Sequence, residues 1–190
     1  RYWALPRLMV LRIPQPNVCE LVPEHLRAEL MQYETGRIRF QWEPEPLSRQ
    51  ALCQRVQASL GPRLLILNTV QSAAVFASDL CDAYGREAVE HLSTALTAAD
   101  RAAASERIKK RLQDQTDTDW TLVATSCVEA GVDFSFRTGF REVSSLLSLL
   151  QAAGRVNRHG TESEAEMWSF RLKDDSMLRP NKALHIEQEV

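Results

Sequence analysis

One short apolar run constrains this chain more than any other feature. Leu64–Leu67 follows Gly61-Pro62 and contains four consecutive apolar residues, which is too short for a buried helix and typical of a strand buried on both faces. Asn68 and Thr69 then offer side-chain oxygens that can cap a helix. The expected helix carries apolar residues along one side: Ala73, Ala77, Leu80 and Tyr84. A strand of this kind needs helices on both faces of its sheet.

The same alternation of strand and helix continues to the end of the chain. We expect further strands at Ala88–Leu92, Trp120–Thr125 and Glu164–Leu172. Thr97 and Asp100 form a capping pair for a helix that runs to Leu112, and another helix is expected at Ser144–His159. The predicted fold class is therefore α/β, in three layers, with a mostly parallel sheet flanked by helices.

The first 62 residues follow a less regular pattern than the rest. They contain most of the prolines, and they suggest short strands at Leu8–Ile13 and Ile38–Trp42. Helical spacing of apolar residues is present in Pro23–Tyr33 and Leu47–Leu60. We therefore expect an irregular lead-in or connector at 1–62 and the main domain at 63–190.

Composition excludes several classes of protein. The 190 residues carry a formal net charge of −2, so any contact with nucleic acid has to be local rather than a broad basic surface. The four cysteines are far apart and lack the spacing of a zinc site, which favours reduced thiols in a cytoplasmic protein and predicts no bound metal. A membrane span and a signal peptide are not expected.

Three loops should lie at the carboxyl ends of the predicted parallel strands, where such folds bind ligands. They are Asn68–Val70, Leu92–Thr94 and Thr125–Asp133. The last loop has small hydroxyl side chains followed by Gly131 and Asp133, which suits phosphate contacts and a hydrogen bond to a ribose. Taken alone, this loop is better explained as a strand end with a capping threonine and a turn.

A second group of candidate residues lies in Gln151–Gly160. Arg155 and Arg158 are three residues apart, so they would share a face of the predicted helix. Two guanidinium groups on one face suit an arginine finger, which stabilises the charge of a transferring γ-phosphoryl group. Taken alone, the segment is better explained as a basic helix C-terminus that ends at Gly160.

Two motifs that a complete ATPase needs are absent from the sequence. The chain contains no GxxxxGK[ST] sequence to hold the β- and γ-phosphates, and no predicted strand ends in a pair of acidic residues that could hold Mg²⁺. ATP and Mg²⁺ would therefore be held mainly by a first motor domain outside these residues, and the chain alone is expected to be inactive.

The order of these motifs resembles the C-terminal RecA-like domain of superfamily 2 helicases, and more closely the Cas3 family of CRISPR-associated helicase-nucleases. The resemblance covers about residues 63–172. It is carried by four segments in the same order: Leu64–Val70 with its helix, His91–Arg101, Val123–Phe134 and Gln151–Gly160.

The resemblance implies roles for specific residues. The tracked single-stranded DNA would contact a set of polar residues, namely Asn68, Thr69, Ser93, Thr94, Thr125 and Ser126. Gly131, Asp133 and Gln151 would face the nucleotide, and Arg155 and Arg158 would be the fingers. The implied partners are a first RecA-like domain of the same protein, single-stranded DNA and a CRISPR effector complex, with no membrane.

One departure leaves a rival interpretation open. Superfamily 2 proteins usually carry arginine directly after the glutamine of the last motif, where this chain has Ala152. The alternative is therefore a non-catalytic RecA-like lobe that binds nucleic acid or docks a protein. A Rossmann-like enzyme for small molecules is disfavoured because the sequence has no GxGxxG. The metal-binding nuclease motif of the family has no match either.

Overall fold

A computed structural model describes residue 26 and residues 36–129 and 133–179. The chain divides into two compact units, Arg1–Glu34 and Thr35–Val190. The elements described here belong to the second unit. Its strands are β1 (Arg39–Trp42), β2 (Arg63–Ile66), β3 (Val89–Leu92), β4 (Thr121–Ala124), β5 (Thr138–Glu142) and β6 (Glu166–Phe170). Its α-helices are α3 (Arg49–Ala58), α4 (Val70–Tyr84), α5 (Ala98–Gln113) and α6 (Leu146–Ala153), with short 3-10 helices η2 (Arg86–Ala88) and η3 (Ser126–Val128).

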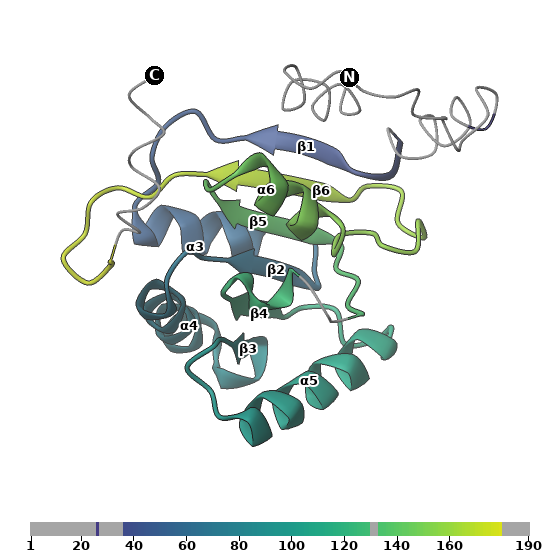
Figure 1. The fold of residues 1–190 in the computed structure, drawn as a ribbon, viewed down its shortest axis with the longest axis horizontal. Coiled ribbons are helices and arrows are strands. Elements are labelled where there is room, and N and C mark those ends of the chain that lie inside the picture. Colours follow the sequence, from purple (N-terminus) through teal and green to yellow (C-terminus); the bar gives the residue numbers. More distant parts are fainter. Residues whose placement is uncertain (1–25, 27–35, 130–132, 180–190) are drawn as a thin grey trace, which may run out of the picture. The chain divides into compact units, whose positions relative to one another are not determined.

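The six strands form one sheet in the order β1-β6-β5-β2-β4-β3, and every neighbouring pair is parallel. Figure 1 shows the strands lying side by side with their arrowheads at the same edge. Strands β2 and β4 are buried at every position, which confirms the expectation from their apolar runs. The predicted parallel α/β sheet is therefore present.

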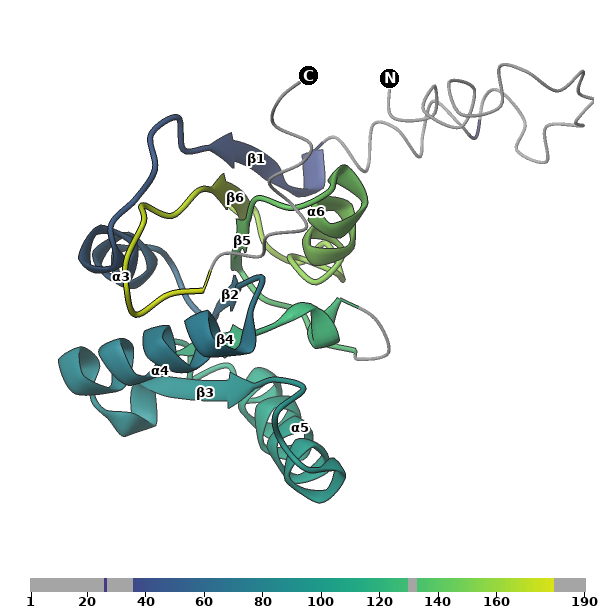
Figure 2. The ribbon, with the colours of Figure 1, turned by 60° about the vertical axis from the view of Figure 1, so that its left-hand side comes forward.

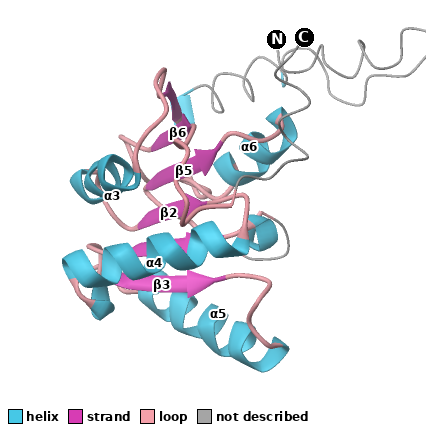
Figure 3. Cartoon of the chain, turned by 90° about the vertical axis from the view of Figure 1, so that its left-hand side faces the viewer, coloured by secondary structure: helices cyan, strands magenta, loops and turns pink. Residues whose placement is uncertain are grey.

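Helices cover the sheet on both faces, as the buried central strands require. Helices α3 and α4 lie on one face, and α5 and α6 lie on the other (Figures 2 and 3). The core beneath α4 contains Phe76 and Leu80, and the core beneath α5 contains Ile108 and Trp120. The three-layer arrangement predicted from the sequence is confirmed.

Two helix starts follow the capping residues that the sequence indicates. Thr69 is the N-cap of α4, where its hydroxyl accepts a hydrogen bond from the Ser72 N–H, and Thr97 caps α5 through the Asp100 N–H. Each cap satisfies a backbone donor that the first helical turn leaves without a partner. Local chemistry alone therefore sets the start of both helices.

Part of the predicted lead-in contributes to the sheet. Strand β1 pairs with β6 as the edge strand, and α3 packs its Leu52 and Val56 into the same core as α4. The expected strand at Leu8–Ile13 and helix at Pro23–Tyr33 lie outside the described residues, apart from Leu26. The division of the chain at residue 62 stays a prediction.

Strand β5 is not predicted from the sequence, although it lies near the centre of the sheet between β6 and β2. Its sequence Thr-Gly-Phe-Arg-Glu lacks the apolar run of a buried strand, yet four of its five residues are buried. Gly139 is needed there because an added Cβ would lie 2.6 Å from Met167 Sδ and from Val156 Cγ2. Close packing between β5, β6 and the segment after α6 therefore excludes a side chain.

Candidate nucleic-acid and nucleotide site

The three predicted ligand loops leave the sheet at one edge. Ile66 of β2 pairs with Ala124 of β4, and Ala124 pairs with Leu92 of β3, so these strands end in register. The ladder continues for one more step, since the Leu67 N–H donates to the Ala124 carbonyl at 2.9 Å and the Thr125 N–H donates to the Leu92 carbonyl at 3.2 Å. The loops that follow β2, β3 and β4 are therefore neighbours at the carboxyl edge.

The hydroxyl groups in these loops differ in exposure. Thr94 and Ser126 are exposed, whereas Ser93 and Thr125 are buried. The Ser93 Oγ lies 3.0 Å from the Nε2 of His91, and burial lowers the pKa of that histidine, which favours its neutral form. Of these four hydroxyls, Thr94 and Ser126 are the two that solvent or a phosphate backbone can reach.

Asn68 is held from several sides within the protein. Its backbone N–H donates to Glu142 Oε2 at 2.7 Å, its Nδ2 donates to the Val143 carbonyl at 2.8 Å, and its Oδ1 accepts from Arg141 at 2.6 Å. The side chain predicted to touch DNA is thus directed toward the end of β5. Its contacts fix the position of the residue that immediately precedes the Thr69 cap.

Arg141 forms an ion pair with Glu129 in the interior of the lobe. Arg141 Nε lies 2.9 Å from Glu129 Oε1, and the two side chains are only 3% and 7% exposed. Burial lowers the pKa of Arg141 and raises the pKa of Glu129, and their mutual attraction opposes both shifts. Arg141 also donates to the Glu142 carbonyl at 2.8 Å. The pair joins the end of β5 to the loop after β4.

The last predicted helix is shorter than the sequence suggests. Helix α6 ends at Ala153, so Arg155 and Arg158 do not share a helix face, and that part of the prediction is wrong. The chain instead forms a bridge with the segment before β5, where the Phe136 N–H donates to the Arg155 carbonyl and the Asn157 N–H donates to the Phe136 carbonyl, both at 2.8 Å. This pairing turns the backbone out of the helical path.

The two arginines therefore lie in different environments. Arg155 is buried, and its guanidinium donates to the Val128 carbonyl at 3.1 Å and to the Glu129 carbonyl at 2.9 Å. Burial, with the nearby charge of Arg158, lowers the pKa of Arg155, although Asp133 opposes the shift. Because these two acceptors are backbone carbonyls of one loop, Arg155 ties that loop to the end of α6.

Arg158, by contrast, reaches solvent. Its Nε lies 2.8 Å from Asp133 Oδ1, and the two side chains are 41% and 69% exposed. Gln151 is exposed as well, and Gly131 lies outside the described residues. The structure thus brings together Asp133 and Arg158, two of the residues predicted to face a nucleotide.

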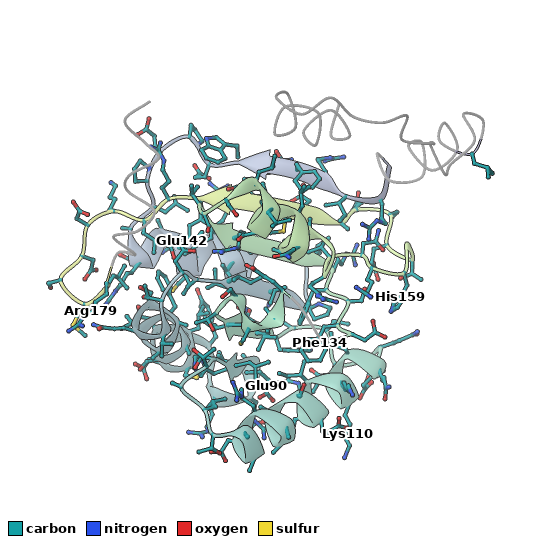
Figure 4. All side chains as sticks on the ribbon, viewed as in Figure 1. Glu90, Lys110, Phe134, Glu142, His159 and Arg179 are labelled. Carbon is teal, nitrogen blue, oxygen red and sulfur yellow. The ribbon has the colours of Figure 1, made fainter. Side chains whose placement is uncertain are left out.

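The residues predicted to face a nucleotide are separate from the carboxyl edge. Helix α6 returns antiparallel to the strands, and Figure 4 shows Glu142 at one end of the sheet while His159, next to Arg158, lies at the other. Phe134, which follows Asp133 in the sequence, lies on the same side of the view as His159. The candidate site therefore has two parts: the loops at the carboxyl edge, and Asp133 with Arg158 away from that edge.

A family model for the C-terminal region of the CRISPR-associated nuclease/helicase Cas3 matches residues 60–161, more than half of the chain. The chain belongs to this Cas3 family. A Cas3 nuclease/helicase from Haloferax volcanii is 44% identical over 43 residues, which are 23% of this chain and 5% of that protein.

Solved structures show the same fold. A crystal structure of T. fusca Cas3-ATP has a TM-score of 0.60 at 16% identity, with 80% of this chain and 20% of that chain covered. A chain of a CRISPR RNA-guided surveillance complex in a pre-nicking state has a TM-score of 0.63 at 17% identity, with 80% of this chain and 21% of that chain covered. The C-terminal domain of the DEAD-box protein Dbp5 has a TM-score of 0.57 at 12% identity, with 74% of this chain and 79% of that domain covered. The predicted RecA-like fold is confirmed, and the chain spans about a fifth of the Cas3 structure.

Ala152, the departure from the usual superfamily pattern, is completely buried in this Cas3-family lobe. It belongs to the core cluster beneath α6, together with Ala153 and Val156. An arginine at this position would have to displace core side chains or bury its charge, which is costly. The alanine therefore fits the way in which α6 packs on the sheet.

Three charged residues of the Cas3-family lobe are missing from the sequence-based site: Glu129, Arg141 and Glu142. Glu129 lies within a recognised motif, but its spacing gives no sign of a partner twelve residues away. Arg141 and Glu142 belong to the strand that the sequence did not reveal. The available signal was a pair of charged residues directly after the aromatic Phe140, which is buried in the structure. Among the residues that the structure describes, each helix is too short or too polar to span a lipid bilayer.

Proposed function

We propose that this chain is the second motor lobe of an ATP-dependent DNA helicase or translocase of the Cas3 type, acting in CRISPR interference against foreign DNA. Membership of the Cas3 family and the RecA-like fold support the assignment. The first RecA-like lobe of the same protein would hold ATP and Mg²⁺, because this sequence has no P-loop.

The exposed guanidinium of Arg158 is the observation that carries the proposal. It stands at the end of the family's last motif with a carboxylate, Asp133, as its ion-pair partner. An exposed ion pair contributes little to stability, about 0–1 kcal/mol, so a γ-phosphate can take the place of the carboxylate at small cost. Arg158 is therefore the better finger candidate, and Arg155 supports the loop beside it.

In the proposed cycle, ATP bound by the first lobe closes the cleft and engages Arg158. Closure and reopening shift the grip of the carboxyl-edge loops on single-stranded DNA, with Thr94 and Ser126 as the exposed hydroxyls that meet phosphates. The family resemblance supports 3′-to-5′ translocation. Docking on a CRISPR effector complex is supported by the likeness to a chain of a surveillance complex.

The test is to replace Arg158 with alanine in the full-length protein. We expect DNA-stimulated ATP hydrolysis to fall by about 10³-fold or more, the range for removal of an arginine finger. The matched control is Lys110→Ala, which removes a positive charge from the exposed surface of α5 (Figure 4). Wild-type hydrolysis by the Arg158→Ala variant would refute the finger assignment. No hydrolysis by the intact protein would support a non-catalytic lobe instead.

A further inference from the structure

The Glu129–Arg141 pair differs from the other ion pairs between described residues because both of its side chains are almost fully buried. The Arg63–Asp119 pair, for comparison, has a buried arginine but a carboxylate that is 74% exposed. Removing two charges from water is costly, and well-packed apolar residues often stabilise a fold equally well. Stability alone therefore does not account for this pair.

The pair lies in the middle of a continuous polar path across the lobe. At one end, the Arg155 guanidinium donates to the carbonyls of Val128 and Glu129. The Glu129 carboxylate then contacts Arg141, and Arg141 donates to the Asn68 carboxamide oxygen at 2.6 Å. Asn68 immediately precedes Thr69, the N-cap of α4. Every link is a direct contact between described residues.

This path connects the two parts of the candidate site. Arg155 lies three residues before Arg158, and the Asp133 charge influences its pKa, so the path begins beside the residues that face the nucleotide. It ends at Asn68 and the start of α4, which lie at the carboxyl edge with the other DNA-contacting loops. Glu142 secures that end, since its carboxylate accepts the Asn68 N–H at 2.7 Å.

We propose that Glu129 and Arg141 are positioning residues that couple the nucleotide state of the cleft to the DNA grip at the carboxyl edge. The inference rests on the proposed motor function and adds the internal link between its two sites. When the cleft closes on ATP, a shift of Arg155 moves the loop that contains Glu129. The buried pair transmits this shift to Asn68, because neither charge can leave its partner without being stranded in the interior.

The coupling is measured as a ratio of two affinities in the full-length protein. The dissociation constant for a fluorescent single-stranded oligonucleotide is determined with and without a non-hydrolysable ATP analogue. Their ratio is the coupling factor, and linkage requires that DNA change the affinity for the analogue by the same factor. We expect a wild-type factor of about 5–150, the usual range for coupled sites.

The decisive variant replaces both members of the pair, Glu129→Gln with Arg141→Met. It removes both charges of the pair together, and the nearby Glu142 loses only the opposing charge of Arg141, so we expect the thermal unfolding midpoint to fall less than in Glu129→Gln alone. Its affinity for the analogue alone should stay within about twofold, while its coupling factor falls to nearly one. A control double variant, Glu106→Gln with Lys109→Gln, removes an exposed ion pair of 3.1 Å and should keep the wild-type factor.

Two outcomes would overturn the coupling inference without refuting the proposed motor function. A folded Glu129→Gln/Arg141→Met variant with wild-type coupling would show that the pair is structural only, and it would overturn this inference while the motor assignment stands. If the double variant does not fold, Asn68→Ala interrupts the same path at its far end and must lower the coupling factor; an unchanged factor would also overturn the inference. A wild-type protein that does not hydrolyse ATP would refute the proposed function.

Discussion

Arg158 lies 2.8 Å from Asp133 and Arg141 lies 2.9 Å from Glu129, yet the first pair is exposed and the second is buried. Distance therefore does not distinguish the two ion pairs, whereas their surroundings do. Water and salt screen the exposed pair, and neither screens the buried pair effectively.

This contrast predicts different costs for breaking each pair. Asp133→Asn should lower the free energy of unfolding by about 1 kcal/mol or less, since exposed pairs contribute little. Glu129→Gln should lower it by about 3–5 kcal/mol, because it leaves the Arg141 charge buried without its counter-charge. Urea denaturation of the 190-residue chain at pH 7 measures both values. Equal losses for the two variants would contradict this explanation.

Replacing Arg155 should also lower the free energy of unfolding more than replacing Arg158. Arg155→Ala removes the donors to the Val128 and Glu129 carbonyls, and stranded buried acceptors cost about 1–3 kcal/mol. Arg158→Ala should change the free energy of unfolding by less than about 0.5 kcal/mol, as exposed substitutions usually do. Thermal and urea unfolding of the two variants provide the comparison. An Arg158→Ala variant that is the less stable of the two would reverse our assignment of their roles.

Gly139 provides a test of the packing around the central strand that the sequence did not reveal. A methyl group there would overlap Met167 and Val156, so Gly139→Ala should destabilise the lobe by about 1–3 kcal/mol, as overpacked cores do. Gly36→Ala is the control, because no neighbouring atom lies within 4 Å of an added Cβ. The difference between the two in urea denaturation isolates the steric effect. Indistinguishable values would show that Met167 and Val156 move aside without cost.

Local sequence signals were sufficient for most of the elements and insufficient for the arrangement at the site. The runs at β2 and β4 and the caps Thr69 and Thr97 act through neighbours in the chain, and all four were predicted correctly. The end of α6 depends instead on the bridge between Val156 and Phe136, which are twenty residues apart. A periodic pattern does not contain that contact.

The buried polar path had the same limitation. Asn68, Glu129 and Arg141 come from three different strand ends, and their proximity follows from the strand order, with β2 between β5 and β4. The sequence indicates each strand end separately, apart from β5, whose polar residues conceal it. The family motifs identify the loops, but the contacts that join the loops require the sheet.

The acidic side chain at the end of β5 predicts a specific dependence of stability on pH. Burial raises the pKa of Glu142 above its ordinary value of 4.5, although the Asn68 N–H and the Arg141 charge oppose the shift. A carboxyl with a raised pKa in the folded state contributes stability below its unfolded pKa, and that contribution is lost as the pH rises through the folded pKa. At neutral pH the ionised Glu142 is therefore less favourable than a neutral group of the same shape.

Glu142→Gln should accordingly stabilise the lobe at pH 7, by a margin that shrinks as the pH falls and disappears below about pH 4.5. The amide oxygen of glutamine can still accept the hydrogen bond from the Asn68 N–H, so this contact at the end of the polar path is kept. Urea denaturation of both proteins between pH 4 and pH 8 follows the margin, with exposed Glu106→Gln as a control that should show little change. If Glu142→Gln were the less stable protein at pH 7, the hydrogen bond and the Arg141 charge would outweigh the cost of burial, and the carboxylate would be a stabilising member of the path.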